Sequence, residues 1–272
     1  MAIIAISRQV AALGDELAEQ AAKKLGYTFF TRKQIEERIV ELGFPKDKLD
    51  KYDEKKPGFF ASLAKGRDEY LNYLQYAVLE AASKGNCILI GRGAFVILED
   101  IPNLVSLRFV AKEQVRIRRL QEEFGWTEKQ AKARIDESQA NRRGFHKSFF
   151  NVDNEDPSHY LLTINTGSIS AQEIVKILEC LAKSVPPEKE AVEKQRILNL
   201  MKAQDLTNKL LFEYKLNINF LRSVIDESGS VITLQGVADC QAIVDRAVTL
   251  AAKILPSCTI KSAVSIVQDF HQ

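Results

Sequence analysis

The chain has 272 residues, of which 46% are hydrophobic and 27% are charged, so we expect a sizeable core and two domains. The formal net charge is only +2, and bulk charge therefore gives no reason to expect nucleic acid or an anionic membrane as a partner. No stretch has the pattern of a targeting signal or a transmembrane segment, which predicts a cytoplasmic protein.

The first strand, loop and helix are predicted at the start of the chain. Residues 2–6 are an apolar, β-branched run that predicts a buried strand, residues 7–14 predict a loop, and Asp15 opens a helix. In α/β proteins such a junction is a common phosphate site, because the helix N-terminus presents N–H groups and the positive end of the helix dipole.

This loop lacks most features of a phosphate-binding loop. Only Gly14 remains of the expected glycines, and Ala11, Ala12 and Leu13 should resist positive φ angles. Asp15 stands where a cation is expected, and a carboxylate there would oppose phosphate binding. On its own, the segment favours an ordinary strand-to-helix turn over a nucleotide site.

The following elements alternate between strands and helices. Further strands are predicted at residues 27–30, 87–90, 104–110 and 160–165, and helices at residues 31–43, 59–83, 113–123, 129–139 and 170–182. Residues 45–56 predict an exposed loop or a frayed helix. Five short apolar strands alternating with helices indicate an α/β fold with a parallel sheet covered on both faces.

Arginines are placed where such a sheet binds ligands. Arg92 lies between two glycines directly after the third strand, so it is a candidate for gripping a phosphate, or else a solvated residue in a tight turn. Arg116 and Arg119 share one helix face, and Arg134, Arg142 and Arg143 follow. These arginines either fold over a ligand or form an exposed face paired with nearby Glu and Asp residues.

Several motifs together resemble one family. They are Ser7-Arg8-Gln9, Gly91-Arg92-Gly93-Ala94, the arginine pattern of residues 116–150, Asp156-Pro157, Tyr160 and Ile164-Asn165-Thr166. Residues 1–183 resemble the cytidylate-kinase-like proteins, a branch of the nucleoside monophosphate kinases. The resemblance implies a three-layer α/β/α P-loop kinase fold with a five-stranded parallel sheet.

The resemblance also implies an activity, the transfer of a phosphoryl group from ATP to CMP or dCMP with Mg²⁺. It places Ser7, Arg8, Gln9 and Gly14 at the phosphates of ATP. Arg92 would meet the monophosphate or its base, and the lid arginines would be Arg116, Arg119, Arg142 and Arg143. We predict no metal ligand among the protein side chains.

Two departures from the family pattern weaken the expectation of catalysis. The loop has Asp15 where relatives carry an arginine, and Gln139 replaces an acidic residue that usually precedes the lid arginines. We therefore expect weak or lost kinase activity. The alternatives are a non-catalytic nucleotide-binding or sensing protein that signals through its C-terminal domain, and a structural protein with an empty pocket.

The C-terminal part is predicted to be a small α+β domain. Residues 184–204 form a charged linker, and residues 205–272 follow the order α-β-β-α-β, with Asp239 capping the second helix. The hairpin at residues 228–236 resembles that of a BON domain, which implies a homo-oligomer, or a protein or lipid partner. The four cysteines, Cys87, Cys180, Cys240 and Cys258, predict reduced, mostly buried thiols.

Overall fold

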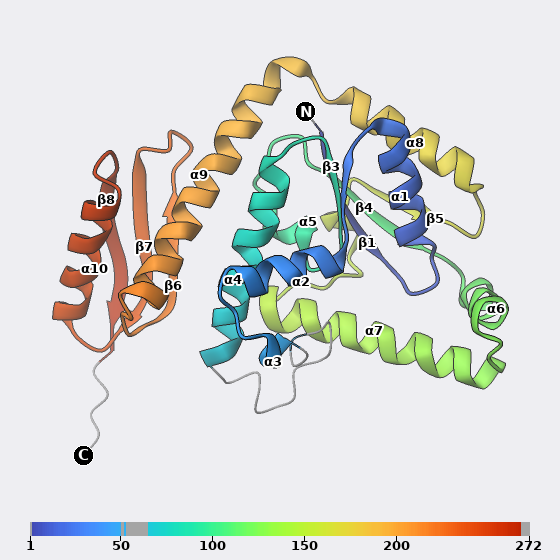
Figure 1. The fold of residues 1–272 in the computed structure, drawn as a ribbon, viewed down its shortest axis with the longest axis horizontal. Coiled ribbons are helices and arrows are strands. Elements are labelled where there is room, and N and C mark those ends of the chain that lie inside the picture. Colours follow the sequence, from blue (N-terminus) through green and yellow to red (C-terminus); the bar gives the residue numbers. More distant parts are fainter. Residues whose placement is uncertain (1, 50–51, 53–64, 268–272) are drawn as a thin grey trace. The chain divides into compact units, whose positions relative to one another are not determined.

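The protein is described here by a computed structural model, shown as a ribbon in Figure 1. It describes residues 2–49, 52 and 65–267. The chain divides into two compact units, Met1–Glu193 and Lys194–Gln272. Parts of the predicted segments 45–56 and 59–83 lie outside the described residues.

The first unit alternates strands with helices. Its strands are β1 (Ile3–Arg8), β2 (Thr28–Phe30), β3 (Cys87–Ile90), β4 (Val105–Val110) and β5 (Leu162–Asn165). Its helices are α1 (Gly14–Leu25), α2 (Arg32–Glu41), α3 (Lys46–Leu49), α4 (Lys65–Ser83), α5 (Ala94–Ile97), α6 (Glu113–Phe124), α7 (Glu128–Phe150) and α8 (Ala171–Ser184), with a 3₁₀ turn at Pro157–His159.

The five strands form one parallel sheet in the order β2-β3-β1-β4-β5. The central strand β1 pairs with β3 on one side, where Ile6 lies beside Ile90, and with β4 on the other, where Ser7 lies beside Arg108. The carboxyl ends of these three strands therefore meet at one edge of the sheet. This is the predicted parallel sheet, and its middle strand leads into the candidate phosphate loop.

Helices cover both faces of the sheet, as predicted. Figure 1 shows α1 and α8 on one side and α4 and α5 on the other, and the contacts of α1 with α8, of α4 with β3 and of α5 with β1 agree. The core under α1 and α8 contains fully buried side chains of three neighbouring strands, among them Ile4, Ile88 and Leu107. Apolar runs buried on both faces explain why these short strands show no polar alternation.

Capping residues set most of the helix ends. Thr31 and Thr127 each form a capping box, and Gly26 and Gly125 end α1 and α6 in the left-handed conformation. The predicted end of α7 at residue 139 is wrong. The helix continues to Phe150 and ends at Asn151, which adopts a φ of 56°, so Arg142 and Arg143 lie on the helix itself.

The second unit is a three-stranded sheet with helices. The long helix α9 (Glu190–Asn208) crosses the division between the units and continues into a π-helical turn (Lys209–Glu213). The strands β6 (Ile218–Ile225) and β7 (Val231–Ala238) are antiparallel, and β8 (Thr259–Ile266) runs parallel to β7 after α10 (Gln241–Ile254). The predicted α-β-β-α-β order is therefore present.

Two predictions about individual residues are corrected. Asp239 does not cap α10, because the helix begins after Cys240 without a side-chain cap, and the Asp239 carboxylate instead accepts a hydrogen bond from Asn217 at 3.1 Å. The four cysteines are unpaired, but only Cys87 and Cys258 are buried, whereas Cys180 and Cys240 are exposed. Among the described residues, no helix is both long enough and apolar enough to cross a membrane.

Candidate functional site

The loop between β1 and α1 has the backbone conformation of a glycine-rich turn without the glycines. Ala11 and Leu13 adopt φ angles of 56° and 55°, so the expectation that they would resist positive φ is wrong. A left-handed conformation costs a non-glycine residue roughly 1–2 kcal/mol. Neighbouring residues must therefore hold the loop in this shape.

Three kinds of contact hold the loop. The Gln9 side chain accepts a hydrogen bond from the Ala111 N–H at 3.1 Å, and the backbone N–H of Gln9 donates to the Phe109 carbonyl at 3.0 Å. Arg119 donates to the Ala11 carbonyl at 2.9 Å. Val10 and Ala11 also pack against the apolar cluster between α6 and α7. The loop is thus tied to β4 and to both helices of the predicted lid.

Asp15 places a negative charge at the start of α1, where a cation is expected. Its exposed carboxylate forms an ion pair with Arg8 at 3.3 Å. The stem of Arg8 runs close under Gly14, where an added Cβ would lie only 2.7 Å from the Arg8 Cγ. Gly14 is therefore needed for close approach, and the nearest arginine of the loop is engaged by the carboxylate that replaces the expected cation.

The turn after β3 holds Arg92 inside the protein. Gly91, Arg92 and Gly93 all have positive φ, and Arg92 is 1% exposed, so the alternative of a solvated arginine is wrong. Its guanidinium donates to the Tyr52 carbonyl at 2.9 Å and to the Tyr70 hydroxyl at 3.0 Å.

Glu36 on α2 neutralises part of the charge around Arg92. Its carboxylate forms ion pairs with Arg92 and with Arg32. Burial lowers the pKa of Arg92 well below its usual value, and the charges of Arg32 and Arg8 lower this pKa further. Glu36 therefore neutralises part of the positive charge that Arg32 and Arg92 bring to this edge of the sheet.

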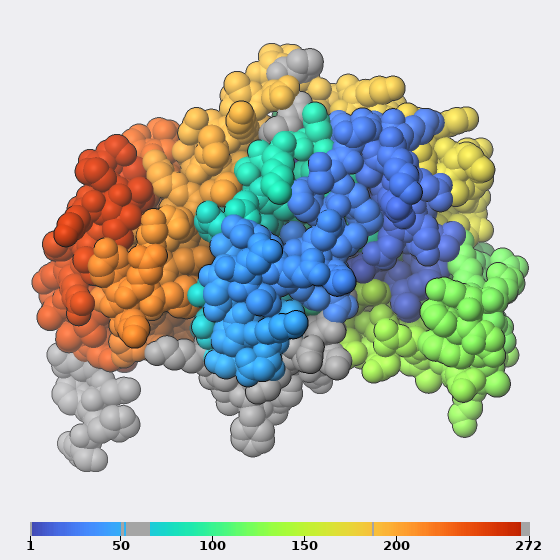
Figure 2. Space-filling view, viewed as in Figure 1, coloured from blue at the N-terminus to red at the C-terminus, as the bar shows by residue number. Residues whose placement is uncertain are grey.

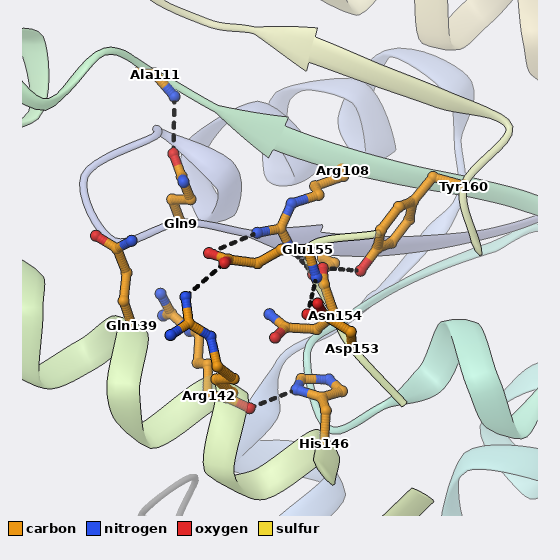
Figure 3. Close-up of polar contacts among 12 residues, drawn as sticks. Gln9, Arg108, Ala111, Gln139, Arg142, His146, Asp153, Asn154, Glu155 and Tyr160 are labelled. Carbon is orange, nitrogen blue, oxygen red and sulfur yellow. Dashed lines mark hydrogen bonds and ion pairs between the residues drawn. The ribbon is translucent and has the colours of Figure 1, made fainter. Parts of the chain in front are cut away.

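A buried arginine on β4 was missed by the sequence analysis. Arg108 is 5% exposed and donates to the Ser7 hydroxyl at 3.3 Å and to the Asn154 carbonyl, which also accepts from the Tyr160 hydroxyl at 2.9 Å. Figure 3 shows Arg108 and Tyr160 converging on Asn154. The available signal was a charged residue inside an otherwise apolar predicted strand.

The lid arginines divide into two groups. Arg116 is buried and donates to the Ala111 carbonyl and to Gln139, each at 3.1 Å, and Arg119 also donates to Thr166. Burial lowers the pKa of Arg116 and of Arg119.

On α7, Arg143 is exposed and pairs with Glu155 at 2.6 Å, whereas Arg142 lines the space beside Ser7. Arg134 pairs with Glu137 on the exposed side of the same helix, and Arg118 pairs with Glu122 on α6. The alternative of an exposed paired face therefore holds for Arg118, Arg134 and Arg143 but not for Arg116 or Arg119. Figure 2 shows α6 and the start of α7 (green) at the surface of the first unit.

The space at the centre of these residues is small. Ser7, Arg8, Gly91, Gly93, Phe95, Arg142 and His146 line a cavity of about 10 Å³, which is room for about one water molecule. A groove of about 440 Å³ opens elsewhere, between α2 and α4, and none of the predicted site residues lines it. The predicted residues Ser7, Arg8 and Arg142 are therefore brought together in a closed arrangement. The side chain of Arg92 does not line this cavity and binds Tyr52, Tyr70 and Glu36 instead.

Comparisons with known proteins agree with this fold. The model of the Cytidylate kinase-like family matches residues 3–168. An uncharacterized protein from Eubacterium ventriosum ATCC 27560 is 20% identical with a TM-score of 0.55, covering 67% of this chain and 98% of that one. A shikimate kinase from Bacteroides thetaiotaomicron is 17% identical with a TM-score of 0.41, covering 67% and 98%. No curated protein matches the chain.

The strand order and the loop between β1 and α1 define an α/β protein with a P-loop kinase-like fold. Because the family model covers more than half of the residues, the chain belongs to the Cytidylate kinase-like family.

Proposed function

We propose that this protein binds a nucleotide through its phosphate groups at the carboxyl edge of the sheet, and that it transfers a phosphoryl group weakly or not at all. The observation that carries the proposal is the left-handed backbone at Ala11 and Leu13. Unfavourable backbone conformations held by surrounding contacts concentrate at functional sites. A loop that keeps this shape without glycines fits a selected role in phosphate binding.

The arginines supply the charge for such a ligand. In this proposal, Ser7, Arg8, Gln9 and Gly14 surround the phosphates of one nucleotide, and Arg92 meets a second phosphate or a base. Arg116, Arg119, Arg142 and Arg143 close over the ligand from α6 and α7. Guanidinium groups suit this role because they bind phosphate in a bidentate manner.

The charge at the start of α1 argues against efficient phosphoryl transfer. Transfer depends on cations that neutralise the charge developing on the transferred group. Asp15 adds a negative charge there and engages Arg8, and Arg116 is bound to the neutral Gln139 in place of an acidic residue. These two features favour binding without turnover.

A cytidylate kinase is the second candidate, because the matching family is cytidylate kinase-like. It would use ATP and Mg²⁺ with CMP or dCMP as the acceptor. In the part of the chain that the structure describes, no three Asp, Glu, His or Cys side chains gather as metal ligands.

A thermal-shift panel tests the proposal and separates the two candidates. The panel contains ATP, CMP, dCMP and CDP, each with and without Mg²⁺, and a parallel assay measures phosphorylation of CMP. A ligand at 100 times its Kd should stabilise the protein by about 2.7 kcal/mol. We expect a rise in Tm with at least one nucleotide and no turnover.

Two variants of α1 sharpen this panel. Asp15→Arg should increase the Tm shift with ATP, whereas Glu19→Arg makes the same charge change at a residue paired with Lys23 and should leave it unchanged. If no nucleotide raises the Tm of any variant, the proposal is wrong and the structural alternative holds. Turnover of CMP by the unmodified protein would favour the kinase.

For the C-terminal unit we propose a binding role, on the basis of its resemblance to a BON domain over residues 205–272. Its α-β-β-α-β order supports the resemblance. The candidate partners are a second copy of the chain, another protein or a lipid, and the expected compartment is the cytoplasm. Light scattering of the full chain, with and without lipid vesicles, would distinguish self-association from lipid binding.

A further inference from the structure

Glu155 is paired with two arginines that come from two different elements. It belongs to the turn after α7, and its carboxylate pairs with Arg143 on α7 at 2.6 Å and with Arg108 on β4 at 3.8 Å. It also acts electrostatically on Arg116 of α6. Figure 3 shows Glu155 placed between Arg108 and the helix α7.

The contact of Glu155 with Arg108 is loose. Nη1 of Arg108 is occupied by Ser7 and by the Asn154 carbonyl. Nη2 faces Glu155 at 3.8 Å, which exceeds hydrogen-bond distance. The neighbouring carboxylate, Asp153, accepts the backbone N–H of Glu155 at 2.9 Å. Glu155 thus leaves room for an anion with more charge and more oxygens.

A buried acceptor lies beside this group. Asn154 is 4% exposed, and its Oδ1 has no hydrogen-bond partner among the described residues. A buried acceptor without a partner costs roughly 1–3 kcal/mol. A ligand hydroxyl or amino group that donates to Asn154 Oδ1 would remove this cost.

We propose that Glu155 occupies a phosphate subsite formed by Arg108 and Arg143, and that the phosphate group of a ligand displaces it. The ligand is a phosphate monoester that also carries a donor group for Asn154 Oδ1, as a nucleoside monophosphate does. This proposal rests on the proposed function. It assigns a binding role to Arg108, and it makes Glu155 an internal competitor of the ligand.

Physical chemistry favours the exchange. A phosphate monoester carries up to two negative charges and three terminal oxygens, whereas Glu155 has one charge and two oxygens. The guanidinium groups of Arg108 and Arg143 can each satisfy the larger anion with parallel N–H···O bonds. Because the side chain of Glu155 is 35% exposed, it can move into solvent when it leaves.

The test is isothermal titration of the full chain with CMP, ATP and inorganic phosphate. Glu155→Gln removes the competing charge and should bind CMP about three- to tenfold more tightly. Glu137→Gln is the matched control, because Glu137 pairs with Arg134 on the exposed side of α7 and should leave CMP affinity unchanged. An unchanged or weaker affinity for Glu155→Gln would overturn the subsite.

Arg108→Lys provides a second comparison. It keeps the charge but loses the planar guanidinium that binds phosphate in a bidentate manner. It should therefore weaken CMP binding about tenfold or more and abolish the gain from Glu155→Gln. If Arg108→Lys does not fold, the comparison of Glu155→Gln with Glu137→Gln still decides whether Glu155 occupies a phosphate subsite.

The outcomes also separate the two proposals. CMP binding that is equal in all three proteins, the unmodified protein, Glu155→Gln and Glu137→Gln, rejects the subsite and leaves the proposed function intact. If none of them binds any nucleotide, both proposals fail.

Discussion

Two turns at the carboxyl edge of the sheet reach similar backbone conformations by different means. After β3, Gly91 and Gly93 flank Arg92, and all three residues have positive φ. After β1, Ala11 and Leu13 adopt positive φ without glycine, because Gln9, Arg119 and the cluster between α6 and α7 hold them. The turn after β3 retains its arginine, whereas the turn after β1 is followed by Asp15, a carboxylate at the position where a cation is expected. Neighbouring contacts can thus preserve a backbone shape, but they do not restore a missing charge.

Arg92→Ala should have the largest effect. It leaves Glu36 with one fewer partner and removes a buried side chain bonded to Tyr52 and Tyr70. Breaking a buried ion pair costs about 3–5 kcal/mol of unfolding free energy. Urea unfolding measures the change. Arg134→Ala, which breaks an exposed pair, is the control and should cost less than about 1 kcal/mol. A similar small loss for Arg92→Ala would show that its turn does not depend on the arginine.

Gly93→Ala should have the next largest effect. The new Cβ would lie 2.4 Å from a ring carbon of Phe150, and φ is +69°. We expect a loss of about 2–4 kcal/mol from the backbone penalty together with the overlap.

The control for Gly93→Ala is Gly26→Ala, which has the same φ of +69° and nothing within 4 Å of the added Cβ. It should lose only about 1–2 kcal/mol in the same urea experiment. Equal losses would mean that the contact with Phe150 is relieved without cost.

Glu193 contrasts with Arg92, because it is a buried acidic side chain whose neighbours form no hydrogen bond with its carboxylate in the part of the chain that the structure describes. It is 0% exposed, neither carboxylate oxygen has a hydrogen-bond partner among the described residues, and burial raises its pKa to about 7. In the unfolded chain the pKa of Glu193 is about 4.3. Below that pH the group therefore makes its full contribution to the free energy of unfolding. It is lost as the pH rises through about 7, because the folded protein holds the proton longer than the unfolded chain.

Glu193→Gln should therefore stabilise the protein by about 1–3 kcal/mol at pH 8 and have little effect near pH 4. Thermal unfolding across this range measures the effect, with Glu188→Gln, an exposed residue just before α9, as the control. A constant difference at all pH values would contradict the assignment.

Ala11→Gly should have the smallest effect and, like Glu193→Gln at pH 8, should stabilise the protein. Relief of the left-handed penalty of roughly 1–2 kcal/mol outweighs the loss of roughly 0.5–1 kcal/mol from the freer unfolded chain, which leaves a gain of about 0.5–1 kcal/mol. Ala12→Gly is the control, because Ala12 is fully buried and has no positive φ. It should destabilise the protein in the same denaturation assay. A loss for Ala11→Gly would mean that the methyl group contributes more than the strain costs.

Local signals predicted much of the fold. The strands at residues 87–90 and 104–110 follow from their apolar runs, and the helix ends at Thr31 and Gly125 follow from cap chemistry. The end of α7 was misplaced because Gln139 carries no stop signal, and the helix continues until Asn151 takes the left-handed conformation. Local sequence therefore predicts the presence of a helix better than it predicts the residue at which the helix ends.

The candidate site was predicted less completely, because it depends on contacts between distant residues. Arg92 could be selected from its position after a strand, but its pairing with Glu36 depends on how α2 packs in the folded chain. Arg108 was missed because the strand was assigned from apolar content alone. The shape of the loop at Ala11 was mispredicted because intrinsic residue preference was considered without Arg119 and Gln9.

The helical hairpin of α6 and α7 carries the one tryptophan in the sequence. Trp126 lies between these helices and stacks on Phe124, with their ring centres 4.7 Å apart. Its indole emission is therefore an intrinsic optical signal from the hairpin that needs no added dye. Quenching or a spectral change on mixing with CMP would give the rate of hairpin rearrangement in a stopped-flow instrument.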